Sequence, residues 1–189
     1  MSASRIEMRF GGTGGQGLIL SAKMLADAMA ADGRSVAQSQ SYEPTSRGGY
    51  CNADLVSVEG EVDFPLLTAI DGLVLLDRLA VKPSWTLLKP RAVVIADIRL
   101  CPELPQTGQP CHHLPLSTTA LDLGSERVTN MVALGALVSQ SGICDIERIE
   151  QAVKANTPRG FLDLNMDALR AGLALGARIG ADRAVAPSA

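Results

Sequence analysis

The segment Gly-Gly-Thr-Gly-Gly-Gln-Gly at residues 11–17 constrains the fold of this chain more than any other part of the sequence. Polar and apolar residues alternate over residues 5–10, which predicts a strand immediately before the glycines. After the glycines, apolar residues recur at the spacing of a helix: Leu18, Ile19, Ala22, Leu25, Ala26 and Met29. A strand, a glycine turn and a helix in this order are typical of the start of an α/β domain.

The following part of the chain continues the alternation of strands and helices. Short apolar runs at residues 73–77 and 92–97 each end in aspartate, which is the pattern of parallel strands buried on both faces. Residues 35–39 and 50–58 predict two further strands. The expected fold class is therefore α/β and Rossmann-like, with a mostly parallel sheet flanked by helices.

The C-terminal third of the chain is predicted to be helical. Apolar residues recur at helical spacing over residues 127–141, 145–155 and 165–179. Before this region, four prolines between residues 100 and 115 exclude a long helix and leave room for one short strand near His112.

Length and composition restrict the number of domains and the kinds of partner. Because 189 residues suit one cooperative core, we expect a single domain over residues 1–180 and a flexible tail over residues 181–189. A net charge of −3 and an aromatic content of 3% argue against a nucleic-acid partner. No apolar stretch approaches the length of a membrane span, and the charged residues 1–10 do not resemble a secretory signal, so we expect a cytoplasmic protein.

Cysteine and histidine show no pattern of a metal or catalytic site. The four cysteines form no C-x-x-C pair, which excludes zinc-knuckle and cubane-cluster patterns and favours reduced, mostly buried thiols. The adjacent His112 and His113 are expected to be exposed loop residues, since neighbouring side chains on an extended chain point to different sides. We therefore expect neither a catalytic residue nor a metal ligand in this chain.

The glycine segment itself has two interpretations. Gly12, Gly14 and Gly17 match G-x-G-x-x-G, whose glycines allow a tight turn, a close ligand approach and close helix packing. At Gly14, a branched side chain is expected to oppose a positive φ and to fill space that an anion needs. The segment can bind a nucleotide or another anion, or serve only as a turn. A simple NAD enzyme is disfavoured because the end of the second predicted strand reads Ala-Gln-Ser-Gln at residues 37–40, with no carboxylate from there to Glu43 that could hold a ribose.

A second glycine pair, in Arg47-Gly48-Gly49, is equally open to two interpretations. Turn chemistry alone predicts a hairpin or bulge before the strand that starts at Tyr50. Alternatively, the guanidinium of Arg47 contacts a phosphate or carboxylate beside the first glycine loop. Both loops are expected at the carboxyl ends of neighbouring strands, where open α/β sheets bind ligands.

Three segments together resemble the gamma subunit of the 2-oxoacid:ferredoxin (or acceptor) oxidoreductases, the pyruvate/ketoisovalerate oxidoreductase catalytic-domain family. These segments are Gly-Thr-Gly-Gly-Gln-Gly at residues 12–17, Arg47-Gly48-Gly49 after Ser41-Tyr42, and Val-Thr-Asn-Met-Val-Ala-Leu-Gly at residues 128–135. The resemblance spans about residues 5–175. Before Arg-Gly-Gly the family usually has Tyr-Gly-Pro-Glu, whereas this chain reads Tyr42-Glu43-Pro44-Thr45-Ser46.

The resemblance implies a subunit of an oxidoreductase complex. Such complexes oxidatively decarboxylate a 2-oxoacid, conjugate the acyl group to coenzyme A and pass electrons to ferredoxin. Thiamine diphosphate, magnesium and iron–sulfur clusters are then expected on partner subunits, because this chain has no motif for them. The chain is expected to be inactive alone, to bind no cofactor firmly and to contribute a structural, coenzyme A-positioning domain. Its partners would be the other subunits and, through the complex, ferredoxin or a similar acceptor; the isolated chain could form a homodimer.

The resemblance also places the cofactor-binding candidates in this sequence: Gly12, Gly14, Gly15, Gln16, Gly17, Arg47, Gly48, Gly49 and Asn130. Several alternatives stay open. The glycine loop could bind a ligand or pack on a partner subunit, and the apolar helix over residues 127–141 could lie in the core or between subunits. A stand-alone nucleotide- or anion-binding Rossmann-like module is the main alternative function, and a flavin or nicotinamide enzyme would reveal itself by tight dinucleotide binding.

Overall fold

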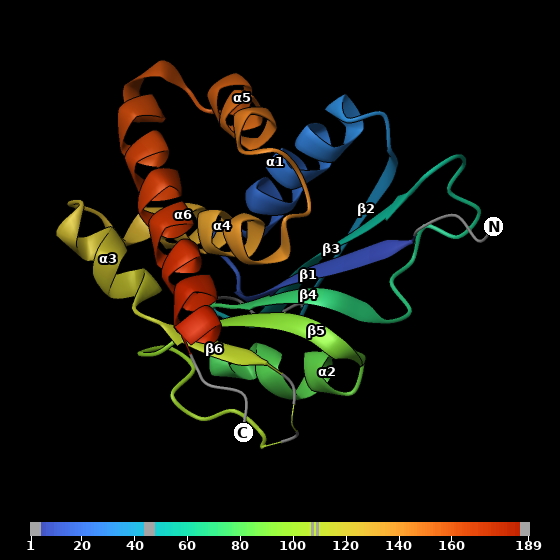
Figure 1. Ribbon diagram of the computed structural model, residues 1–189, viewed down its shortest axis with the longest axis horizontal. Coiled ribbons are helices and arrows are strands. Elements are labelled where there is room, and N and C mark those ends of the chain that lie inside the picture. Colours follow the sequence, from blue (N-terminus) through green and yellow to red (C-terminus); the bar gives the residue numbers. More distant parts are fainter. Residues whose placement is uncertain (1–4, 44–47, 107, 109, 186–189) are drawn as a thin grey trace.

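One mixed sheet organises the structure, a computed structural model that describes residues 5–43, 48–106, 108 and 110–185. In these residues six strands lie in the order β2-β3-β1-β4-β5-β6 (Figure 1). Their bounds are β1 Ile6–Thr13, β2 Ser35–Tyr42, β3 Tyr50–Val58, β4 Ile70–Leu75, β5 Leu88–Asp97 and β6 Cys111–Leu114. Each pair from β1 through β4 and β5 to β6 is parallel, whereas β3 is antiparallel to both β1 and β2. Only β3 therefore runs against the other described strands, which confirms the prediction of a mostly parallel sheet.

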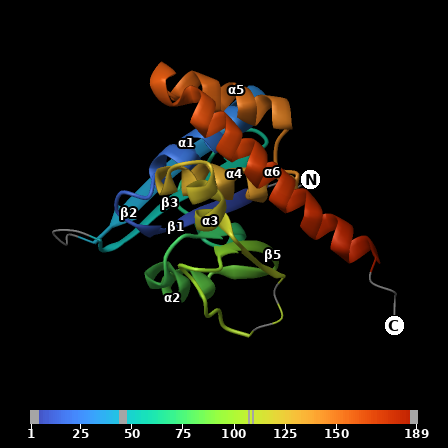
Figure 2. The ribbon, with the colours of Figure 1, turned by 90° about the vertical axis from the view of Figure 1, so that its left-hand side faces the viewer.

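Helices cover both faces of this sheet unequally. Helices α1 (Leu18–Ala31) and α4 (Thr129–Ser141) lie directly on one face, and α5 (Ile146–Asn156) and α6 (Leu162–Val185) form a second layer outside them (Figures 1 and 2). The other face carries the 3₁₀ turn η1 (Arg78–Ala80) and the short α2 (Val81–Trp85). Helix α3 (Leu116–Asp122) and the 3₁₀ turn η2 (Glu126–Val128) lead into α4, and the 3₁₀ turn η3 (Arg159–Phe161) leads into α6.

The pleat of the strands divides the buried side chains between two cores. Successive residues of a strand point to opposite faces, so Val74 joins the core under α1 and α4, whereas Leu73 and Leu75 join the core under α2. The first core is the larger one and contains Phe10. Both faces of β4 are buried, as the continuous apolar run predicted.

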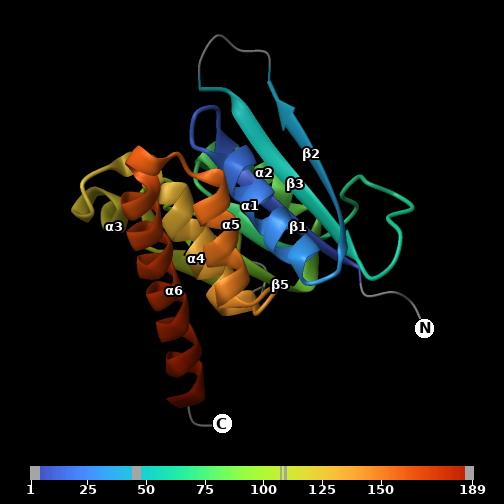
Figure 3. The same cartoon turned by 90° about the horizontal axis from the view of Figure 1, so that it is seen from above.

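Several elements extend beyond the ranges that periodicity predicted. Strand β2 continues to Tyr42 instead of residue 39, because backbone pairing with β3 persists as far as Tyr42 opposite Cys51. Helix α3 was not predicted at all. Helix α6 begins before and ends after residues 165–179, and it extends past the body of the protein toward the C-terminus (Figure 3). Of the predicted flexible tail, residues 181–185 belong to α6 and residues 186–189 lie outside the described part, so the flexibility of the tail stays a prediction.

The two adjacent histidines are on the one short strand that the sequence left room for near His112, so the expectation that they are loop residues was wrong. His112 and His113 lie on β6, at the edge of the sheet, where His112 pairs in register with Ile95. His113 is exposed, and its Nε2 lies 3.0 Å from the carbonyl oxygen of Cys101. Four prolines did not prevent this strand because they flank its four residues and leave the ladder intact.

Glycines bring α4 and α6 unusually close together. A Cβ on Gly135 would lie 2.2 Å from the carbonyl oxygen of Leu169, and a Cβ on Gly172 would lie 2.0 Å from that of Val132. Nearly every residue of α4 is buried. The apolar helix and the small residues of α6 are therefore explained by packing within this chain, as the core interpretation proposed.

Candidate functional site

The glycine loop lies at the carboxyl end of β1, and its conformation differs from the expected one. The left-handed residues are Gly15 (φ 95°) and Gly17 (φ 72°), whereas Gly14 has no positive φ. A Cβ on Gly14 would meet no atom within 4 Å. The expectation of a positive φ at Gly14 was therefore wrong, because β1 continues through Gly11 and Gly12 to Thr13 and shifts the turn along the chain.

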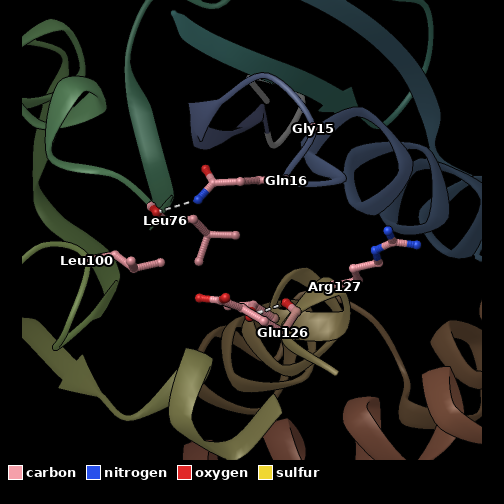
Figure 4. Close-up of a pocket in the computed structure, with 7 residues that line it drawn as sticks. Gly15, Gln16, Leu76, Leu100, Glu126 and Arg127 are labelled. Atoms are coloured by element: carbon pink, nitrogen blue, oxygen red, sulfur yellow. Dashed lines mark hydrogen bonds between the residues drawn. The ribbon is translucent and has the colours of Figure 1, made fainter. Parts of the chain in front are cut away.

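The side chain of Gln16 joins the carboxyl ends of β1 and β4. Its Oε1 accepts a hydrogen bond from the Thr13 N–H at 2.7 Å, and its Nε2 donates to the Leu76 carbonyl oxygen at 2.8 Å (Figure 4). After β1 the chain enters α1 on one face, and after β4 it enters η1 and α2 on the other face. Gln16 therefore spans the topological switch point, the place where open α/β sheets commonly bind ligands.

The side chain of Asn130 fixes the start of α1 from the neighbouring helix α4. Its Nδ2 donates to the Gly17 carbonyl oxygen and to the Ser21 Oγ, both at 3.1 Å, and only 5% of the residue is exposed. A Cβ on Gly17 would lie 2.4 Å from this Nδ2. Gly17 thus allows close packing of the loop on α4, the role that its place in the motif predicted.

The two glycines of the Arg-Gly-Gly segment, Gly48 and Gly49, lie beside the glycine loop at the same edge of the sheet. The segment belongs to the connection between β2 and β3, and the Gly49 carbonyl oxygen accepts a hydrogen bond from the Gly14 N–H at 3.3 Å. Gly48 is exposed and has a φ of 70°. The hairpin interpretation and the neighbouring-loop interpretation are therefore compatible. Arg47 lies outside the described residues, so its contact with an anion stays a prediction.

Two hollows flank the glycine loop and share Gly15. The larger hollow has a volume of about 510 Å³ and lies between the loop and the hairpin of β2 and β3. Its lining comprises Gly14, Gly15, Ile19, Tyr42, Glu43, Gly48, Gly49 and Cys51. The smaller, of about 330 Å³, has Gln16 and Glu126 on opposite sides (Figure 4); its lining comprises Gly15, Gln16, Leu76, Leu100, Glu126, Arg127 and Thr129. Five of the nine candidates from the sequence line at least one of these hollows, namely Gly14, Gly15, Gln16, Gly48 and Gly49. Asn130 lines neither and bonds to the loop from α4.

Sequence reasoning missed Arg127, which lines the smaller hollow. Glu126 forms an ion pair with Arg99, while no ion pair is found for Arg127 among the described residues. Its position in the sequence could have identified it, because Arg127 precedes the candidate Asn130 by three residues, about one helical turn.

The hydrogen bonds of the loop leave some of its donors unused. The N–H groups of Thr13, Gly14 and Gln16 bond to protein acceptors. Within the described residues, no acceptor is found for the N–H groups of Gly15 and Gly17, and Gly15 lines both hollows, which makes its N–H a candidate donor to an anion.

The two strand-ending aspartates have structural partners. Asp97 is fully buried and accepts hydrogen bonds from the N–H groups of Arg99, Leu100 and Ser117. Asp77 accepts from the Leu79 N–H and caps η1. These carboxylates hold the turns at the carboxyl edge and are not arranged as an acid–base pair.

The thiols are poor nucleophiles. Burial raises the pKa of Cys51 and Cys111, and burial together with nearby carboxylates raises the pKa of Cys101 and Cys144 to about 12. Thiols with a raised pKa stay protonated near neutral pH. No group of three or more His, Cys, Asp or Glu that could hold a metal occurs in the described part of the chain, and none of its helices is long and apolar enough to cross a membrane.

Comparisons with known proteins give the relatives of this chain. The sequence model of the family described as Pyruvate ferredoxin/flavodoxin oxidoreductase matches residues 7–175. The 2-oxoglutarate synthase subunit KorC of Archaeoglobus fulgidus is 32% identical over 174 residues, which cover 92% of this chain and 89% of that protein.

Solved structures share the fold. The gamma subunit of keto/oxoacid ferredoxin oxidoreductase from Geobacter sulfurreducens has a TM-score of 0.80 and 35% identity, covering 90% of this chain and 98% of its own. The 2-oxoglutarate:ferredoxin oxidoreductase of Magnetococcus marinus, solved with 2-oxoglutarate, coenzyme A and succinyl-CoA, has a TM-score of 0.81 at 23% identity. That match covers 97% of this chain and 32% of the other chain.

Proposed function

The chain belongs to the pyruvate ferredoxin/flavodoxin oxidoreductase family as a gamma-type subunit, and we propose that its carboxyl edge positions coenzyme A in a 2-oxoacid:ferredoxin oxidoreductase complex. In the proposed reaction a 2-oxoacid loses carbon dioxide, its acyl group forms a thioester with coenzyme A, and two electrons pass to ferredoxin. We place this complex in the cytoplasm.

Electron transfer and decarboxylation belong to partner subunits in this proposal. Iron–sulfur clusters require cysteine thiolates, and thiamine diphosphate is normally held through a metal ion. The described residues offer no group of three or more metal ligands, and the four cysteines form no C-x-x-C pair, so these groups do not fit here. The chain's own contribution is to bind and orient a ligand.

One observation carries the choice of coenzyme A: the hydrogen bond from Gly14 N–H to Gly49 O brings the glycine loop and the Arg-Gly-Gly segment to one hollow. Free N–H groups and an arginine suit the phosphates of coenzyme A. Beside them, Ile19 and Tyr42 are 41% and 67% exposed and offer apolar surface to an adenine ring. A longer chain, of which 32% matches this fold, was solved with coenzyme A bound.

The comparisons also suggest which 2-oxoacid to assay first. The relative that is 32% identical over most of this chain is a subunit of 2-oxoglutarate synthase. We propose 2-oxoglutarate as the first substrate, with pyruvate and branched-chain 2-oxoacids as the comparison.

Arg47 tests the coenzyme A proposal. Arg47→Lys keeps the positive charge but loses the planar fork, so the KM for coenzyme A of the reassembled complex should rise about tenfold. Arg47→Ala should raise it further, while the melting temperature of the chain stays within about 2 °C of the unmodified value. Arg91→Lys, an exposed arginine on β5, is the matched control.

An unchanged KM for coenzyme A in both Arg47 variants would remove Arg47 from the site. A changed melting temperature with unchanged kinetics would assign it a structural role instead. If the isolated chain binds coenzyme A tightly and never assembles with partners, the alternative of a stand-alone anion-binding module is correct.

A further inference from the structure

We infer that Gln16 and Asn130 are positioning residues: their carboxamides hold the glycine loop in its ligand-binding shape, and neither touches the ligand. The inference rests on the proposed function of the loop. The sequence grouped both residues with the ligand contacts, whereas in the structure their carboxamides bond to other groups of the protein.

The polar atoms of Gln16 are bonded at both ends to the backbone. The Thr13 N–H and the Leu76 carbonyl oxygen lie at the ends of two adjacent strands, so the carboxamide fixes the loop to β4 as well as to β1. A Cβ on Gly12 would lie 2.3 Å from Gln16 Oε1. The first glycine of the motif therefore makes room for the Gln16 carboxamide.

Asn130 plays the matching part at the other end of the loop. Its carboxamide bonds to the Gly17 carbonyl oxygen and to Ser21, and the Ser21 Oγ bonds back to the Asn130 carbonyl oxygen at 3.4 Å. A Cβ on Gly17 would collide with this amide. The last glycine of the motif thus makes room for Asn130, just as Gly12 does for Gln16.

Between these two anchors lie the groups available to a ligand. Gly15 and Gly17 keep N–H groups without a protein acceptor in the described part, and Gly14 bonds to the hairpin at Gly49. A preorganised site loses little conformational entropy when it binds its ligand. Loosening either anchor should therefore weaken ligand binding and leave the catalytic steps on the partner subunits unchanged.

Two measurements on Gln16→Ala and Asn130→Ala test the inference. The first is hydrogen exchange at the Gly14 N–H of the full chain, because neither substitution removes a partner of that bond. We expect exchange to quicken about fivefold or more in both variants. The second is kinetics of the reassembled complex, where the KM for coenzyme A should rise about tenfold and kcat should change less than about twofold.

Asn156→Ala and Gln151→Ala are the matched controls. The Asn156 side chain donates hydrogen bonds to Asp27 on α1 and to the Ala152 carbonyl oxygen. Asn156→Ala therefore removes as many hydrogen bonds donated by a carboxamide as Asn130→Ala does, but away from the loop. Gln151 is exposed on α5. Both controls should leave the Gly14 exchange rate and the KM for coenzyme A unchanged.

Each contrary result has a distinct meaning. A higher KM with unchanged Gly14 exchange would make Gln16 or Asn130 a direct ligand contact and overturn the inference. Faster exchange with an unchanged KM would show that the amides order a loop that coenzyme A does not use, which removes the proposed function and the positioning role together. A loss of kcat at unchanged KM would also contradict the inference.

Discussion

At the scale of single residues, the glycines of the loop perform different tasks that the motif alone does not separate. Gly12 and Gly17 make room for two carboxamides, Gly15 and Gly17 adopt positive φ, and Gly14 meets neither requirement. The partners of the loop, Leu76 and Asn130, are 60 and 113 residues away in the sequence. Residue types therefore predicted which segments matter, whereas the hydrogen bonds that join them across 60 and 113 residues required the three-dimensional structure.

Gly17→Ala should destabilise the chain, and Gly14→Ala should not. At Gly17 an alanine meets both an unfavourable φ and the buried Asn130 amide, which together cost about 2 to 3 kcal/mol. At Gly14 the added methyl meets open space. Urea unfolding of the two variants measures the difference. Equal stabilities would show that the loop accommodates a side chain at Gly17 and that the packing on α4 is loose.

At the scale of elements, periodicity located most strands and helices because apolar residues face a single core on each side of the sheet. It failed where long-range pairing decides the ends, as at Tyr42 of β2, which is exposed but pairs with Cys51 of β3. It also missed α3, which lies directly after the proline-rich segment. Nothing in the sequence indicated that β1 holds the segment between β3 and β4. It does so through the carboxylate of one residue, Glu7.

Glu7 on β1 is 2% exposed and anchors that segment. Burial alone would raise its pKa, but hydrogen bonds from Arg5, Thr68 and Ala69 outweigh burial and lower the pKa. Because the folded pKa lies below the unfolded one, this carboxylate stabilises the fold at neutral pH, and its contribution disappears as the pH falls through the folded pKa.

Glu7→Gln should therefore lower the free energy of unfolding at pH 7 by about 1 to 3 kcal/mol and lose most of that effect in acid. Urea unfolding of both proteins at pH 7 and at about pH 3 provides the comparison. A difference between the two proteins that stays constant over this range would show that the charge of Glu7 does not hold the segment.

At the scale of the whole molecule, the chain is a gamma-type subunit of the pyruvate ferredoxin/flavodoxin oxidoreductase family, whose relatives are subunits of oxidoreductase complexes. Its α/β architecture and family were predictable from the sequence, because the glycine loop, the Arg-Gly-Gly segment and the Asn130 segment form a distinctive set. In the structure, Gly49 and Asn130 both bond to the glycine loop. The substrate was not predictable, since no acid–base pair or metal cluster that could recognise or transform a 2-oxoacid is found among the described residues.

The most direct test is to purify the tagged chain from its native cells without oxygen and to assay 2-oxoacid- and coenzyme A-dependent reduction of a viologen dye. We expect the chain to bring its partner subunits with it, the eluate to be active only when both substrates are present, and the chain purified alone to be inactive. Dye reduction by the chain alone, or its recovery from native cells without partners and without activity, would contradict its assignment as a coenzyme A-positioning subunit.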